Sequence, residues 1–250
     1  MKPPQSGYPE GTAVRPRAQR THPDSRRRRP MPWQFDVPEA TVQRLSAYLA
    51  ILRRLDREGK MTASSSEIAR HANVNAAQVR KDLSYFGDFG RRGLGYRVRD
   101  LRDHLMRILG VGRERRVVVI GAGNLGAALA GYPGFEPRGF RITGVFDNNP
   151  AKVGHRLYGQ EIMGMDRLAE VVENAGVEIA IVAVPGAAAQ AVVDAVVETG
   201  IHSILNLAPI RVMAPPSVVI RSVDMTSQLE VLSFCLTHVG EPAGRTEGEY

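Results

Sequence analysis

Apolar residues recur at every third or fourth position in the first third of the chain, which is the spacing of one helix face. This pattern predicts a first helix that starts at Pro38, a residue suited to the first helical turn, and ends at Gly59. The predicted inner face of this helix consists of Val42, Leu45, Leu49, Leu52 and Leu55.

Two short helices follow, and residues 64–86 are interpreted as a helix-turn-helix. Each helix begins with a capping box, a polar residue followed three positions later by Glu or Gln, and the boxes start at Ser64 and Asn75. The outer face of the second helix is expected to show side chains that suit base edges and phosphates. The expected inner residues are Ile68, Ala69, Ala72, Val79, Leu83 and Phe86, and the expected outer ones are Gln78, Arg80, Lys81 and Ser84.

Glycine turns and a cationic tip predict a β-wing over residues 86–96. Three helices and a basic wing predict a winged-helix domain at residues 34–97, followed by a linking segment, 98–115, that is helical over 98–109. Small capped helices also occur in proteins that never meet DNA, but the placement of Arg and Lys favours DNA binding. The candidate DNA-binding residues are Ser66, Gln78, Arg80, Lys81, Ser84, Tyr85, Arg91, Arg92 and Tyr96.

From Arg116 onward, β-branched apolar runs alternate with helical patterns, which is typical of a doubly wound parallel sheet. The predicted fold class is therefore α/β, with an N-terminal winged helix-turn-helix followed by a Rossmann-like domain at residues 116–225. Strands are expected at 116–120, 140–146, 178–184, 203–207 and 218–223, and helices at 124–131, 165–175, 187–199 and 226–238.

The first strand runs into Gly121, Gly123 and Gly126, the G-x-G-x-x-G loop of dinucleotide-binding domains. Glycine at these positions permits a tight turn and lets helix amides reach a pyrophosphate. The second strand ends at Asp147, whose carboxylate suits the adenosine ribose and repels a 2′-phosphate, so NADH and NAD+ are favoured over NADPH and NADP+. The candidate cofactor-binding residues are Gly121, Ala122, Gly123, Asn124, Leu125, Gly126, Tyr132, Asp147, Val184, Pro185, Asn206, Ala208, Pro209 and Asp224.

Catalysis is not expected, because a dehydrogenase needs a substrate pocket and a positioned acid or base beside the nicotinamide. The sheet uses nearly all of the chain after Asp147, which leaves no second catalytic domain. His155 and His202 are expected at the surface, and Asp224 alone makes no catalytic group.

Charge is divided unevenly along the chain. Residues 1–33 carry a net charge of +6, residues 34–120 carry +7 and residues 121–250 carry −6, within a total of +7. A basic DNA-binding half and an acidic cofactor domain are what nucleic-acid binding predicts, whereas solubility alone is the simpler explanation.

Residues 1–33 hold seven of the 16 prolines and an arginine run at 26–29, without apolar periodicity, and residues 240–250 form a second tail. Both are expected to be disordered, and the arginine run either contacts DNA phosphates or is only solvated. Cys235, the single cysteine, lies in an apolar run and is expected to be a core residue, with no disulfide and no metal site. No run reaches membrane-spanning length and no signal peptide is present, so a cytoplasmic protein without a membrane partner is expected.

Residues 36–238 resemble the Rex family of redox-sensing transcriptional repressors. The resemblance is carried by the strings QVRKDLSYFG at 78–87, GLGY at 93–96, GAGNLG at 121–126, YPGF at 132–135 and NLAP at 206–209. It implies a homodimer that NADH displaces from double-stranded operator DNA while NAD+ competes for the site. Gene expression would then follow the NADH/NAD+ ratio.

The resemblance also implies roles for particular residues. Arg80 and Lys81 would belong to the recognition helix, and Tyr132 and Asp224 would line the nicotinamide end and sense its redox state. Residues 226–239 would form a domain-swapped dimerisation helix.

The chain departs from the family in its first helix, at the position where an arginine often pairs with the aspartate that matches Asp224. Ala50 stands at that position here. Arg53 or Arg54 from the next turn would replace the arginine, or the switch works without that pair.

Two alternatives to the repressor remain open from the sequence. One is a small NAD-dependent oxidoreductase with a helical appendage. The other is a nucleotide- or CoA-binding dimerisation module in which the cofactor is structural.

Overall fold

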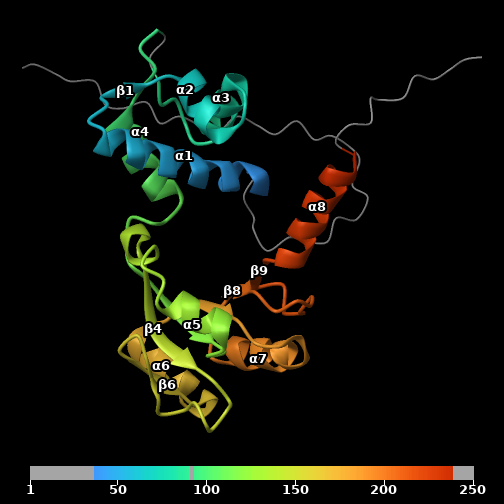
Figure 1. Cartoon of the computed structure of the whole chain (residues 1–250). Helices are drawn as coiled ribbons and strands as arrows, with labels where there is room; N and C mark the ends of the chain where they lie inside the picture. Colours follow the sequence, from blue (N-terminus) through green and yellow to red (C-terminus); the bar gives the residue numbers. More distant parts are fainter. Residues whose placement is uncertain (1–36, 91–92, 239–250) are drawn as a thin grey trace, which may run out of the picture. The chain divides into compact units, whose positions relative to one another are not determined.

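The structure, a computed structural model, describes residues 37–90 and 93–238 (Figure 1). Helices and a two-stranded sheet come first along the chain, and a seven-stranded sheet with its helices follows. This order confirms the predicted α/β class with a helical N-terminal domain and a Rossmann-like domain.

Four helices enclose the core of the N-terminal domain: α1 (Glu39–Arg57), α2 (Ser65–Ala72), α3 (Ala76–Ser84) and α4 (Val98–Ile108). The apolar positions three or four apart on α1 fall on one buried face, as the spacing predicts. The buried side chains from all four helices form one cluster, which includes Leu45, Leu49, Leu52, Leu55, Ile68, Val79, Leu83, Leu101 and Leu105.

Both helix caps form, although the reciprocal half of each predicted capping box does not. Ser64 Oγ accepts the Glu67 amide at 3.1 Å, and Asn75 Oδ1 accepts the Gln78 amide at 2.7 Å. The Glu67 carboxylate pairs with Lys60, and the Gln78 amide group donates to Asp82. The caps therefore fix where α2 and α3 start, while the longer side chains bond elsewhere.

The β-wing predicted over residues 86–96 is formed only in part, because among its described residues the last alone lies in a strand. Strand β2 (Tyr96–Arg97) pairs antiparallel with β1 (Thr62–Ala63), which precedes α2, and residues 86–90 and 93–94 form no strand. Gly95 permits this pairing, because a Cβ on it would lie 2.5 Å from the Ala63 carbonyl oxygen. The predicted wing tip, Arg91 and Arg92, lies outside the described residues.

Asp82 on α3 is the one fully buried charged side chain among the described residues. Arg44 on α1 donates to both of its carboxylate oxygens, at 2.6 and 2.7 Å, and the Tyr48 hydroxyl donates at 2.8 Å. Burial alone would raise the pKa of Asp82, but hydrogen bonds from Arg44, Tyr48 and Gln78 outweigh it and hold the pKa below its ordinary value. The core of this domain therefore contains a satisfied carboxylate.

The second domain is built on a sheet in the strand order β5-β6-β4-β3-β7-β8-β9. The chain starts in the middle at β3, builds outward through β4 and β6, and then crosses to β7 on the other side of β3. This reversal is the switch point at which ligands bind in such sheets. The parallel strands are β3 (Arg115–Ile120), β4 (Phe140–Phe146), β6 (Gln160–Met163), β7 (Ile179–Val182), β8 (Ser203–Asn206) and β9 (Val219–Ser222), and β5 (Arg156–Leu157) is antiparallel to β6.

The helices of this domain confirm the predicted alternation, with boundaries that shift by a few residues. The helix expected at 165–175 begins as a short 3-10 turn, η2 (Met165–Arg167), before the α-helix. The hairpin β5–β6 was not predicted, because β5 has only two residues and β6 begins with two polar residues, which leaves no apolar run. The helices are α5 (Asn124–Ala130), α6 (Leu168–Ala175) and α7 (Gly186–Glu198), with a second 3-10 turn, η1 (Glu136–Arg138).

Helix α8 (Met225–His238) is present where predicted, but none of its side chains is buried. Leu229, Phe234 and Leu236 are all exposed, Leu236 to 80%. The expectation that Cys235 is a core residue is therefore wrong for the single chain, because the apolar run around it faces no other element of the described residues.

Asp82→Asn is expected to reduce the free energy of unfolding by about 2–3 kcal/mol at neutral pH, since it breaks a buried ion pair whose arginine is partly exposed. The folded pKa lies below the unfolded value of about 3.9, so the contribution is present above that pH and is lost as pH falls through the folded pKa. The stability difference between wild type and variant should therefore shrink below about pH 4. Urea titrations followed by circular dichroism across pH measure this, and a difference that grows in acid contradicts it.

Candidate functional site

A cavity of about 290 Å³ lies at the carboxyl ends of β3, β4 and β7. This is the edge of the sheet at the switch point, where the sequence predicts the cofactor site. Five predicted residues line the cavity: Gly121, Gly123, Asp147, Val184 and Pro185. Other lining residues are Ile120, Asn148, Lys152, Met165, Ala183, Ala188 and Val192.

The three glycines of the loop have different roles. Gly121 has a φ of +101°, and a Cβ on it would lie 2.4 Å from the Ala183 carbonyl oxygen. A Cβ on Gly126 would lie 1.7 Å from the Gly121 carbonyl oxygen, so α5 packs directly on the loop. Gly123 has no atom within 4 Å of its Cβ position and is open to the cavity. Two glycines therefore build the turn, and the third leaves room for a ligand.

Asp147, at the end of β4, holds the glycine loop in place. Its carboxylate accepts the Ala122 amide at 2.8 Å, the Asn149 amide at 2.8 Å and the Lys152 ammonium at 3.0 Å. Burial alone would raise the pKa of Asp147, but the bonds from Asn149, Lys152 and Ala122 together hold it below the ordinary value. The carboxylate is therefore charged at neutral pH at the position where the ribose is predicted.

Lys152 is a residue that the sequence analysis missed. It lies in the turn after Asp147, lines the cavity and is a little over one-third exposed. A lysine five residues after the strand-end aspartate is the available signal, but spacing alone does not show that the turn brings the two side chains together.

Asn206 and Ala208 are buried and are not among the residues that line the cavity. The Asn206 side chain donates to the Ile210 carbonyl at 2.9 Å and accepts the Ala208 amide at 3.1 Å. Asn206 therefore fixes the loop after β8, whose Pro209 is exposed. Ala122, Asn124 and Leu125 belong to the glycine loop and the first turn of α5, and Asn124 and Leu125 are exposed.

Tyr132 and Asp224 are not among the residues that line the cavity. Both are exposed, and the Tyr132 ring stands edge-on to Phe135 at 5.0 Å between centroids. Asp224 Oδ1 accepts the amides of Thr226 and Ser227, at 2.9 and 3.4 Å. In the single chain Asp224 therefore caps α8.

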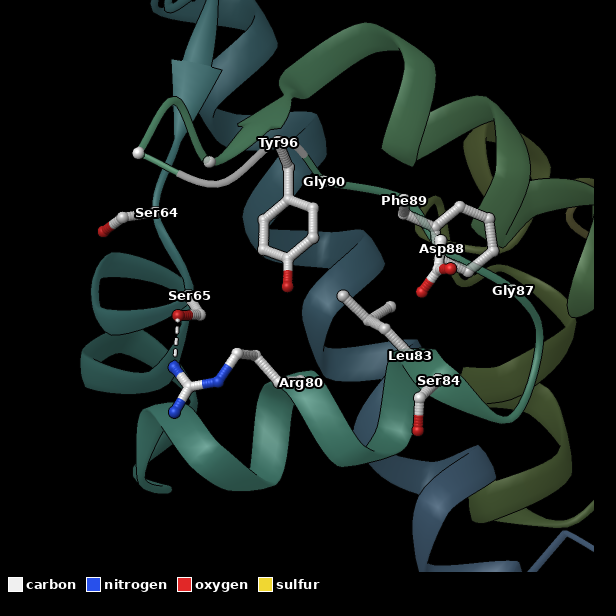
Figure 2. A pocket seen from close by; sticks show the side chains of 12 residues that line it. Ser64, Ser65, Arg80, Leu83, Ser84, Gly87, Asp88, Phe89, Gly90 and Tyr96 are labelled. Atoms are coloured by element: carbon white, nitrogen blue, oxygen red, sulfur yellow. Dashed lines mark hydrogen bonds between the residues drawn. The ribbon is translucent and has the colours of Figure 1, made fainter.

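In the N-terminal domain, a cavity of about 510 Å³ lies between α2, α3 and the loop that leads to β2 (Figure 2). Arg80 extends from α3 along its edge and donates to the Ser65 hydroxyl at 3.0 Å. Tyr96 is only 8% exposed, and its hydroxyl is directed into the cavity toward Arg80 and Leu83 (Figure 2). Burial raises the pKa of Tyr96, although the charge of Arg80 opposes the shift.

Most of the predicted DNA-binding residues that the structure describes are exposed, and the half-buried Gln78 and the buried Tyr96 are the exceptions. Ser66, Arg80, Lys81, Ser84 and Tyr85 are exposed. The prediction that Gln78 faces outward is wrong, because its side-chain nitrogen donates to the buried Asp82 at 2.7 Å.

No helix of the described residues is long and apolar enough to cross a membrane. Residues 37–90 and 93–238 also bring together no group of three or more His, Cys, Asp or Glu side chains that would hold a metal ion.

These features define a class of protein in which a winged-helix-type domain with an exposed basic helix is joined to a Rossmann-like domain with a glycine-loop cavity. Two family models match: "Putative DNA-binding protein N-terminus" over residues 36–84 and "CoA binding domain" over residues 112–210. The chain is 51% identical to the redox-sensing transcriptional repressor Rex of Carboxydothermus hydrogenoformans, over 80% of this chain and 96% of that protein.

Two solved structures are also similar. One is RSP in complex with beta-NAD+ and operator DNA, with a TM-score of 0.78 and 34% identity over 82% of this chain and 95% of that chain. The other is RSP in complex with beta-NADH, with a TM-score of 0.74 and 32% identity over 82% and 97%. The chain belongs to the Rex family of redox-sensing transcriptional repressors.

Gly126→Ala is expected to lower the free energy of unfolding by about 3 kcal/mol, because the new Cβ would overlap the Gly121 carbonyl oxygen and force the backbone apart. Gly123→Ala is the matched control, with open space around its Cβ and an expected loss of no more than about 1 kcal/mol. Urea unfolding followed by circular dichroism compares the two. Equal stability of the variants would show that α5 does not depend on this close approach.

Proposed function

We propose that this chain is a repressor that binds double-stranded operator DNA through α3 and is released when NADH occupies the cavity at the end of β3. Gene expression then follows the NADH/NAD+ ratio. The observation that carries the proposal is that one chain contains both the exposed basic side chains of α3 and the cavity lined by Gly123 and Asp147. The RSP structures with operator DNA and beta-NAD+ and with beta-NADH support it.

The cavity residues fit a nicotinamide dinucleotide. Gly123 leaves space beside the first turn of α5, whose free backbone amides suit a pyrophosphate. Asp147 offers a charged carboxylate to the adenosine ribose, with Lys152 beside it. The bound cofactor would supply a ring that is cationic in NAD+ and neutral in NADH, and Tyr132 and Asp224 are the residues that we propose sense this difference.

Helix α8 is proposed as the dimerisation helix. Leu229, Leu232, Phe234 and Leu236 are all exposed in the single chain, and a helix with this many apolar side chains in water requires a covering surface. A second copy of the chain would bury them by exchanging the helix. The proposed dimer would place two α3 helices on one operator, as a two-fold symmetric site requires.

We further infer that the chain binds the cofactor without turning it over, and that it acts in the cytoplasm where operator DNA lies. Asp147 and Lys152 are the charged side chains of the cavity lining, and they pair with each other. Within the described part of the chain, the cavity lining contains no histidine, cysteine or tyrosine, so beside this pair it offers no separate acid or base of the kind that the oxidoreductase alternative requires. Incubation with NADH and candidate carbonyl compounds would reveal turnover if that alternative holds.

Operator binding should weaken as the NADH/NAD+ ratio rises, measured by fluorescence anisotropy with a duplex that the wild-type protein selects from a random pool. If NADH favours the DNA-incompetent arrangement, operator DNA must weaken NADH binding by the same factor, typically about 5–150-fold. Operator affinity that is independent of the ratio, despite tight NADH binding, would favour the module with a structural cofactor.

The double variant Arg80→Ala, Lys81→Ala should lose operator binding while its affinity for NADH, measured by calorimetry, stays unchanged. Removing a side chain that bonds a base edge is expected to cost about 1–3 kcal/mol of binding free energy. Arg57→Ala with Arg107→Ala is the matched control, because it removes the same charge from α1 and α4, outside the proposed DNA surface. Equal weakening in both variants would mean that α3 contributes charge alone and reads no bases.

Asp147→Ala should weaken NADH binding and also relax discrimination against NADPH. The carboxylate that accepts the ribose hydroxyls is removed, and Lys152 is left unpaired where a 2′-phosphate would lie. Calorimetric titration with both cofactors checks this. Unchanged affinity and unchanged discrimination would place the adenosine elsewhere.

A further inference from the structure

The network around Asp82 joins the recognition helix to α1 on the side of α3 opposite its exposed basic residues. Arg80, Lys81 and Ser84 are exposed, whereas Asp82 is fully buried. Burying a charged carboxylate costs free energy unless hydrogen bonds reach both of its oxygens. A buried carboxylate at this position therefore requires a physical explanation.

Four side chains donate to the two oxygens of Asp82. Oδ1 accepts Thr41 Oγ1 at 3.2 Å, Arg44 Nη2 at 2.7 Å and Gln78 Nε2 at 2.7 Å. Oδ2 accepts Arg44 Nε at 2.6 Å and the Tyr48 hydroxyl at 2.8 Å. Three of the four donors lie on α1, so this carboxylate bonds the two helices together.

Arg44 on α1 donates to both carboxylate oxygens of Asp82 on α3. These bonds depend on the relative orientation of the two helices more strictly than contacts between apolar side chains do. Leu45, Val79 and Leu83 belong to the same core cluster, and apolar packing of this kind is non-directional. The two parallel hydrogen bonds from Arg44 orient the carboxylate plane of Asp82. The Tyr48 hydroxyl, one turn further along α1, adds a third hydrogen bond to the same carboxylate. The network therefore constrains the rotation of α3 about its own axis, together with the buried Val79 and Leu83.

The same network binds the side-chain nitrogen of Gln78, which is half-buried. A glutamine on a recognition helix is a typical reader of adenine, through its amide oxygen and nitrogen together. Here the side-chain nitrogen is bound to Asp82 and the backbone amide to Asn75. Gln78 thus completes the buried network from within α3.

We propose that Asp82 is a positioning residue for operator recognition: through Arg44 and Tyr48 it sets the rotation of α3 that directs Arg80 and Lys81 at the bases, and Gln78 serves this network. The proposal rests on the proposed function, because it presupposes that α3 reads an operator. It deepens that function by naming a buried group on which sequence discrimination depends.

Tyr48→Phe is the decisive variant, because Tyr48 is fully buried and cannot touch DNA. It removes one donor to Asp82 and keeps the ring in the core. We expect the ratio of operator affinity to affinity for a scrambled duplex of equal length to fall about tenfold. Affinity for the scrambled duplex should stay unchanged, since it depends on phosphate interactions that tolerate rotation of the helix.

Gln78→Ala gives an independent readout, with operators substituted at each position in turn. A helix that has rotated loses discrimination at several base pairs, whereas removal of a side chain that reads one base relaxes a single position. Gln43→Ala is the matched control, because Gln43 is exposed on α1 and bonds to Glu39 on the same helix. This control should bind the operator as wild type does.

The outcomes are distinguishable. A variant that fails to fold loses affinity for both duplexes and its circular dichroism signal, and Gln78→Ala then decides. An unchanged specificity ratio in Tyr48→Phe, or relaxation at a single base pair in Gln78→Ala, overturns the positioning role while leaving the repressor intact. Failure of wild-type protein to prefer any duplex overturns the proposed function, and this inference with it.

Discussion

The buried carboxylate of Asp82 is the interaction on which the arrangement of the N-terminal domain depends. Apolar packing among residues such as Leu45, Val79 and Leu83 contributes most of the stabilising free energy, but it is non-directional. A charge excluded from water must keep its hydrogen-bond partners, so the bonds among Asp82, Arg44 and Tyr48 restrict how α1 and α3 pack. The exposed surface of α3 is thus determined from the buried side.

A steric constraint has the corresponding role in the Rossmann-like domain. Gly126 accommodates no side chain because it packs on the Gly121 carbonyl, and Gly121 accommodates none because it packs on Ala183, which brings the start of α5 onto the end of β3. Asp147 then bonds the Ala122 amide and holds the loop against the end of β4. The glycine loop that lines the cavity is therefore held in place without a ligand, and a dinucleotide would meet a preorganised site.

The two sites are separate in the chain, so regulation of one by the other needs an equilibrium between two arrangements. A cofactor shifts such an equilibrium only by the difference between its affinities for the two arrangements. The ring of NAD+ and that of NADH differ by one charge, which charged or polar groups detect at short range. Asp224 caps α8 in the single chain, so the proposed sensing residue also belongs to the start of the proposed dimerisation helix.

The sequence by itself determined the order of the helices and of the longer strands, the caps at Ser64 and Asn75 and the glycine loop, because these depend on periodicity and on residues close together in the chain. It also located Asp147, since the end of a strand can be read from its apolar run. It did not show the short strands β1, β5 and β6. Only the tertiary structure decided the rest. It paired Tyr96 with Ala63, left Cys235 exposed, joined Lys152 to Asp147 and turned Gln78 inward to Asp82. The physical reason is that side-chain partners far apart in sequence, and the burial that makes a polar group need them, exist only once the helices and strands have packed.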